Sequence, residues 1–131
     1  MNEQGEKGLA LFREIYGDSM AEGITAQIDA GSDFGVEQSR WTLEFTFGSV
    51  WVRPGLERKL RSCVVLGMLI AGGHREEIKY HTKMGMANGL TRKELEEIFY
   101  TTFPYAGFPA ANVAKAAMLE AFAELDAATT P

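Results

Sequence analysis

The 131-residue sequence predicts an all-α protein formed by a single domain that spans residues 1–131. Apolar residues recur three and four positions apart in most segments, which is the period of an α-helix. Only residues 36–51 combine β-branched and aromatic side chains in a way that also permits a strand, and the sequence offers no second strand to pair with them. We therefore predict a bundle of helices joined by loops.

In the first half of the chain, periodicity and turn residues predict three helices. They cover about residues 6–16, 18–30 and 36–51. Asp18 or Ser19 is the expected N-cap of the second helix, because both side chains accept hydrogen bonds from free backbone N–H groups. Pro54 lies just beyond the third helix and is expected to end it.

The second half predicts four more helices, at about residues 56–71, 75–88, 91–102 and 109–125. The first of them begins charged and ends apolar on nearly every side, which is typical of a central helix, and Gly72 and Gly73 are expected to close it. Thr91 and Glu94 have the spacing of a capping box at the start of the third. The pattern breaks at residues 103–109, and we expect the tail at 126–131 to fray.

Composition excludes several classes of function. The formal net charge of −5 argues against nucleic acid as a partner, because nucleic-acid-binding proteins usually carry a basic surface. Cys63 is the only cysteine, so the chain has no intrachain disulfide and no CxxC motif. The longest apolar run is about half of a membrane span, and the acidic start lacks a signal core. We therefore expect a cytoplasmic protein with no membrane contact.

Aromatic residues are frequent in the first part of the chain. Trp41, Phe45, Phe47 and Trp51 fall within eleven residues. A small helical domain often leaves such apolar surface for another subunit. We therefore expect a homo-oligomer.

The residues with the clearest potential for chemistry lie between Gly72 and His81. This stretch contains both histidines, His74 and His81, and the carboxylate of Glu77. On a helix, Glu77 and His81 are one turn apart on the same face. A carboxylate in that place holds the imidazole in one tautomer and raises its basicity, so the pair is our candidate for proton transfer.

A metal site is a less favoured interpretation of the same stretch. His74, Glu77 and His81 share one helical face and have the ligand types of a two-histidine, one-carboxylate site. Three ligands spread over two helical turns are poorly placed for one ion, so we predict that the protein has no metal site.

Five segments in order resemble the carboxymuconolactone decarboxylase family, and the resemblance extends from about residue 8 to 122. The matching segments are Phe47–Leu56, Arg58–Ser62, Glu76–His81, Asn88–Thr91 and Tyr105–Asn112. The resemblance implies an alkylhydroperoxidase D-like helical bundle, a homo-oligomer that is a trimer or hexamer, and no cofactor. It also implies a lyase that removes CO2 from a small carboxylated lactone.

The resemblance implies roles for individual residues as well. His81 would deliver a proton and Glu77 would orient it. The substrate-binding candidates are Arg53, Arg58, His74, Trp51 and Tyr105, with Arg61 and Lys83 as weaker ones. The related peroxidase branch has a CxxC pair before the equivalent histidine, whereas this chain has His74 and Glu77 there, so thiol chemistry is not expected.

Other interpretations stay open at this stage. His81 could be a packed core residue, and Glu77 a solvated partner of Lys79 or Arg75. Lys83 stands where decarboxylases of the family usually have arginine. This difference affects the choice of substrate more than the fold. The alternatives to a 4-carboxymuconolactone decarboxylase are an enzyme of the same fold acting on another small lactone or ketone in a biosynthetic pathway, and a non-catalytic oligomeric binding protein.

Overall fold

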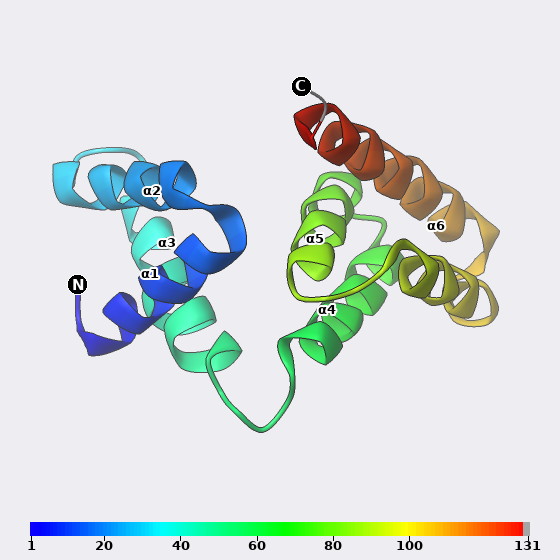
Figure 1. The fold of residues 1–131 in the computed structure, drawn as a ribbon, viewed down its shortest axis with the longest axis horizontal. Coiled ribbons are helices and arrows are strands. Elements are labelled where there is room, and N and C mark those ends of the chain that lie inside the picture. Colours follow the sequence, from blue (N-terminus) through cyan, green and yellow to red (C-terminus); the bar gives the residue numbers. More distant parts are fainter. Residues whose placement is uncertain (130–131) are drawn as a thin grey trace. The chain divides into compact units, whose positions relative to one another are not determined.

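The computed structural model describes residues 1–129, and this part of the chain consists of helices joined by loops, with no strand (Figure 1). The all-α prediction is therefore confirmed for the described residues. Contacts within the chain divide it into two compact units, Met1–Leu56 and the residues from Glu57 onward. A single domain over the whole chain stays a prediction.

The first unit is formed by four consecutive helices. They are α1 (Glu3–Tyr16), α2 (Asp18–Ala30), α3 (Val36–Trp41) and the π-helix η1 (Thr42–Trp51). Asn2 caps α1, because its side-chain oxygen accepts a hydrogen bond from the backbone N–H of Gly5 at 2.8 Å. The predicted cap of α2 is wrong: Gly17 occupies the N-cap, and Asp18 lies in the first turn, where it pairs with Arg13.

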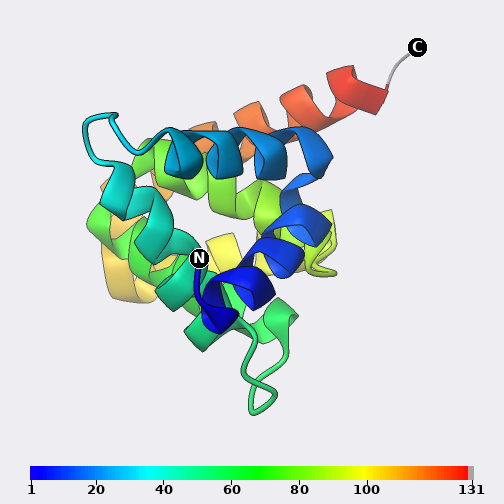
Figure 2. The ribbon, with the colours of Figure 1, turned by 90° about the vertical axis from the view of Figure 1, so that its left-hand side faces the viewer.

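The helical interpretation of residues 36–51 is confirmed, but most of the segment is wound as a π-helix. Leu43, Phe47 and Trp51 follow one another every four residues and are all buried. A π-helix has more residues per turn than an α-helix, because its hydrogen bonds run from i to i+5. This spacing keeps the three side chains on the face of η1 that meets α1. The two helices lie side by side in both views (Figure 1, Figure 2).

Two glycines allow α1 and η1 to approach until their backbones nearly touch. A β-carbon on Gly8 would lie 1.9 Å from the carbonyl oxygen of Leu43, and one on Gly48 would lie 1.9 Å from that of Gln4. An aromatic cluster fills the space beside the crossing. Its ring centroids lie 4.7–6.3 Å apart, and its members are Phe12, Tyr16, Phe47 and Trp51.

The second unit contains α4 (Arg58–Gly72), α5 (Arg75–Ala87) and α6 (Arg92–Thr129). Its core is apolar and draws on all three helices and the loop before α6. The buried members are Leu66, Ile70, Ile78, Leu90, Leu95, Ala114, Ala117 and Met118. Gly73 adopts a left-handed conformation and ends α4, as predicted.

The capping box at the start of α6 is confirmed. The backbone N–H of Glu94 donates to the Thr91 hydroxyl at 3.0 Å, and the N–H of Thr91 donates to the Glu94 carboxylate at 3.0 Å. The predicted break at residues 103–109 is a kink within α6, where Gly107 has φ 86° and ψ 169° between two prolines. Helix continues through residues 126–129, so the predicted fraying is wrong there, and residues 130–131 lie outside the described part.

No helix of the described residues is long and apolar enough to cross a membrane. A cytoplasmic location stays a prediction.

Candidate functional site

Helix α5 carries the two residues predicted to transfer a proton. Glu77 and His81 lie one turn apart on the same face, with 3.9 Å between the Glu77 Oε2 and His81 Nε2 atoms. The His81 side chain is only 20% exposed, whereas that of Glu77 is 60% exposed. The carboxylate therefore lies at the surface, and the imidazole reaches toward the interior from the same face of the helix.

The two nitrogens of His81 have different surroundings. Nε2 faces Glu77, while Nδ1 is buried and has no hydrogen-bond partner among the described residues. Burial lowers the pKa of His81 because the charged ring loses hydration, and the negative charge of Glu77 opposes this effect. The ring is therefore expected to be neutral near pH 7. A buried ring nitrogen without a partner is a position at which a ligand could form a hydrogen bond.

A second buried polar atom without a partner lies two turns further along α5. The Asn88 side-chain N–H donates to the Ser62 hydroxyl of α4 at 3.0 Å, but the Asn88 Oδ1 atom is buried without a partner. Residues seven apart project from nearly the same helical face, so His81 and Asn88 share one side of α5. Ser62 and Asn88 belong to the matching segments, but no role was predicted for either of them. Ser62 directly follows Arg61 in the charged start of α4, so no local pattern marked it.

Charge pairs hold α5 against the last part of α6. Arg75 and Lys79 both contact Glu120, at 3.1 and 3.3 Å, and Lys79 also contacts Glu124 at 3.2 Å. Lys83 pairs with Glu124 as well. The pKa of Lys79 is raised, chiefly by the hydrogen bond that Lys79 donates to Glu124. Lys83, a weaker candidate for binding substrate, is thus already paired with a carboxylate of its own chain.

The remaining predicted site residues have varied surroundings. His74 is the exposed N-cap of α5, and its ring lies against Gly72. Tyr105 is 89% exposed near the kink of α6. In the first unit, Trp51 is 6% exposed within the aromatic cluster, so it has little surface for contact with a substrate. Arg53 is exposed.

Arg58 begins α4 and is partly buried. The structure therefore brings Glu77 and His81 together as predicted. The substrate-binding roles of the other five residues stay predictions.

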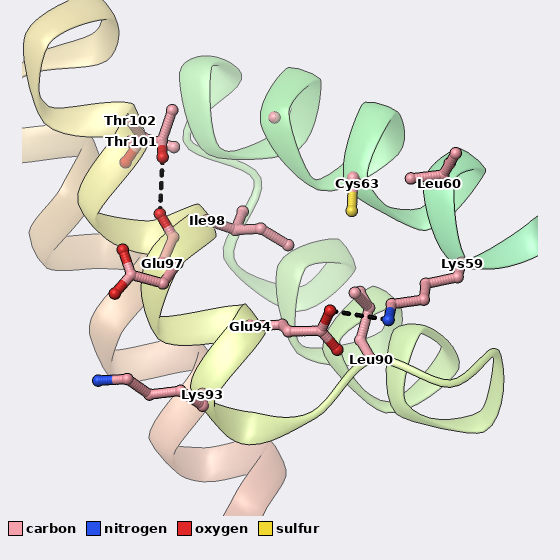
Figure 3. Close-up of a pocket in the computed structure, with 11 residues that line it drawn as sticks. Lys59, Leu60, Cys63, Leu90, Lys93, Glu94, Glu97, Ile98, Thr101 and Thr102 are labelled. Atoms are coloured by element: carbon pink, nitrogen blue, oxygen red, sulfur yellow. Dashed lines mark hydrogen bonds and ion pairs between the residues drawn. The ribbon is translucent and has the colours of Figure 1, made fainter.

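Two pockets lie among the described residues of the second unit, and His81 lines neither of these two. The larger has a volume of about 460 Å³ and lies between α4 and the start of α6 (Figure 3). Burial raises the pKa of the Cys63 thiol in its wall. The other, of about 350 Å³, lies between the two halves of α6. The features that support a reaction at His81 are therefore the ring and its neighbours, and not either of these pockets.

The described residues contain no group of three or more histidine, cysteine, aspartate or glutamate side chains placed to hold a metal ion. The two-histidine interpretation of residues 74–81 is therefore not supported in this part of the chain.

The described residues form an all-helical protein in which a largely buried imidazole lies beside a carboxylate. The family model for the carboxymuconolactone decarboxylase family matches residues 37–120. The chain belongs to this family.

Two relatives agree with the assignment. The chain is 32% identical over 120 residues to the 4-carboxymuconolactone decarboxylase of Acinetobacter baylyi, covering 92% of this chain and 87% of that protein. It is 30% identical over 104 residues to the nitrosuccinic acid decarboxylase of Metarhizium robertsii, covering 79% of this chain and 71% of that protein. Both relatives are decarboxylases, and the protein is a carboxy-lyase. The interpretation as a non-catalytic binding protein is therefore not favoured.

Proposed function

We propose that the protein removes CO2 from 4-carboxymuconolactone, a reaction of the 3-oxoadipate pathway of aromatic degradation. The observation that carries this proposal is the His81 ring, which is largely buried, faces Glu77 through Nε2 and leaves Nδ1 without a partner. The similarity to the Acinetobacter baylyi decarboxylase over nearly the whole chain supports the choice of substrate.

The chemistry requires one proton and a place for negative charge. The carboxylate of the substrate is vinylogous to the lactone carbonyl, so the electron pair of the breaking C–C bond moves into the ring and gives a dienolate and CO2. A proton delivered to carbon then gives the enol-lactone. The ring accepts the electrons itself, so the proposed reaction uses no cofactor.

His81 is the proposed proton donor. Its pKa is lowered by burial in the free protein, but an anionic substrate beside Nδ1 would raise that pKa, as Glu77 already does from the other side. Substrate binding would thus favour the protonated ring, which delivers its proton to the dienolate and regains one from solvent. Glu77 would orient the imidazole and stabilise its charged form.

The substrate is a dianion, and a chain of net charge −5 needs local cations to hold it. We propose Arg53 and Arg58 for the carboxylates, because the guanidinium fork binds a carboxylate through two hydrogen bonds. His74, Trp51 and Tyr105 are the further candidates for contact with the substrate. The working form is proposed to be a cytoplasmic homo-oligomer, a trimer or a hexamer.

A second candidate is decarboxylation of another small acid whose carboxylate is activated by a neighbouring electron-withdrawing group. The similarity to an enzyme named for nitrosuccinic acid favours this alternative, as does Lys83 in a place where the family usually has arginine. Loss of CO2 beside a nitro group also leaves a delocalised anion, so the same histidine would supply the proton.

Assaying the purified protein on both acids, with CO2 release as the readout, tests these proposals. We expect turnover of 4-carboxymuconolactone and a fall in kcat of about 10²–10⁴-fold in His81→Gln, the usual contribution of a general acid. The matched control is Glu76→Gln on the same helix, which changes a side chain that is 64% exposed and should leave most of kcat. Turnover of nitrosuccinate alone would favour the second candidate, and equal kcat values for His81→Gln and wild type would contradict the role of His81.

A further inference from the structure

The pocket of about 350 Å³ between the two halves of α6 lies outside the site described above, since His81 does not line it. The chain turns back at the Gly107 kink, so that Arg92 at the start of α6 pairs with Asp126 near its end. The Arg92 guanidinium group also lies over the Phe122 ring, 4.7 Å from its centroid. These contacts tie the two halves of the helix together at one end of the pocket.

Aromatic and apolar side chains form most of the pocket wall. Phe99 and Tyr100 line it from the first half of α6, and Met118, Leu119 and Phe122 line it from the second half. Met118 is 4% exposed, whereas Tyr100 and Leu119 are about half exposed, so the pocket extends from the core to the surface. Rings and a thioether suit a flat aromatic ligand, because ring–ring and sulfur–ring contacts are favourable beyond the area that they bury.

The charged residues of the pocket leave one positive charge without a partner. Arg92 is paired with Asp126. Glu96 is paired with Lys93 at 2.8 Å. Lys115 also lines the pocket, and its ammonium group has no ion pair or hydrogen bond with any described residue. The pocket therefore combines an aromatic wall with one uncompensated cation, which is the chemistry that attracts an aromatic anion.

We propose that this pocket binds a small aromatic monocarboxylate, with its ring against Phe99 and Phe122 and its carboxylate on the ammonium group of Lys115. The pocket volume is at the small end of the range of ligand sites, which is about 300–1,000 Å³, so it suits a single ring better than a nucleotide. One uncompensated lysine matches one negative charge, whereas a phosphate monoester carries nearly two.

Isothermal titration calorimetry with benzoate as the probe tests this proposal. We expect saturable binding with a dissociation constant of about 1 mM or lower, which is appropriate for so small a ligand. Benzamide has the same shape without the charge, and cyclohexanecarboxylate has the charge without the aromatic ring. Each should bind about fivefold or more weakly than benzoate. A lack of saturable binding by benzoate, or an equal affinity for either analogue, would overturn the proposal.

The variant Lys115→Gln tests the role of the lysine. It should bind benzoate about fivefold or more weakly than wild type and bind benzamide equally well, because only the charged ligand uses the ammonium group. Lys7→Gln in α1 is the matched control, since that side chain is 58% exposed and belongs to the other unit, and it should bind benzoate as wild type does. Unchanged affinity for benzoate in Lys115→Gln, or loss of both ligands, would contradict the proposed contact.

The variant His81→Gln distinguishes this pocket from the proposed site of decarboxylation. Benzoate is itself a carboxylate, and at the α6 pocket it should bind His81→Gln with the affinity of wild type. A loss of benzoate binding in His81→Gln would assign the ligand to the histidine and overturn the proposal. None of these measurements uses turnover, so an inactive protein that binds benzoate would refute the proposed reaction alone.

Hydrogen exchange followed by mass spectrometry locates the bound ligand. At a benzoate concentration ten times the dissociation constant, amides in residues 92–100 and 115–122 should exchange up to about tenfold more slowly, because binding opposes local opening of both halves of α6. Amides of α1 should exchange at an unchanged rate. Protection of only one half of α6, or of neither half, would refute a site between them.

Discussion

The crossing of α1 and η1 allows a quantitative prediction about stability. In Gly8→Ala the new β-carbon would lie 1.9 Å from the Leu43 carbonyl oxygen and 2.8 Å from the Gly48 nitrogen. Both obstacles are backbone atoms, so the clash cannot be relieved by turning a side chain. The two helices must separate by more than 1 Å, since ordinary contacts of this kind begin at 3.4 Å.

The magnitude follows from the cost of overpacking. Extra methyl groups in a packed core cost about 1–3 kcal/mol even when side chains can adjust, so we expect a loss of about 3 kcal/mol or more for Gly8→Ala. The matched control is Gly23→Ala, where a β-carbon meets nothing within 4 Å. There the gain in helix propensity should stabilise the protein by about 0.5–1 kcal/mol.

Tryptophan fluorescence during urea unfolding is the appropriate assay. Both tryptophans, Trp41 and Trp51, belong to the first unit, and Trp51 lies in the aromatic cluster beside the crossing. The signal thus reports on the unit that contains the substitution. A Gly8→Ala protein whose midpoint equals or exceeds that of wild type would show that α1 and η1 do not meet at these glycines.

Three further predictions concern the second unit. Glu77→Gln removes the negative charge that raises the pKa of His81. Because the proposed proton donor works in its protonated form, the alkaline limb of the kcat profile should move to lower pH; an unmoved limb would contradict the pairing. Because burial lowers the folded-state pKa of His81 below its ordinary 6.5, the unfolded chain binds the proton more readily, and stability should fall as pH drops below about 6.5. His81→Gln should lose this part of the pH dependence in urea titrations at pH 7.5 and 5. Thr91→Ala removes one half of the capping box and should cost about 0.5–2 kcal/mol by thermal unfolding, whereas an unchanged midpoint would show that the cap is unimportant.

Local signals in the sequence predicted much of the fold. The capping box of Thr91 and Glu94, the end of α4 at Gly73 and the shared face of Glu77 and His81 each depend on residues within a few positions of one another. The lack of a second strand to pair with favoured helix over strand at residues 36–51. Periodicity could not reveal the π-helical winding there, because residues spaced by four suit an α-helix and a π-helix alike.

Features that join distant segments were not predicted. The bonds of Lys79 to Glu120 and Glu124 span more than forty residues, and the Asn88–Ser62 bond spans twenty-six. A single sequence does not show which charges meet across helices. The kink at Gly107 was predicted only as a break in the helix. The nearby prolines signal an interruption, but they do not show that the helix resumes beyond it and contacts α5.

The charge pairs between α5 and α6 have a consequence for how the protein is made. The helix that carries His81 has its carboxylate partners some forty residues later in the chain, at Glu120 and Glu124. A ribosome must therefore synthesise nearly all of the chain before α5 can settle in its final position. Until then the positive charges of Arg75, Lys79 and Lys83 lack their partners on α6, and Lys79 has only Glu76 of its own helix, so a nascent chain paused before residue 120 would present these charges to its surroundings.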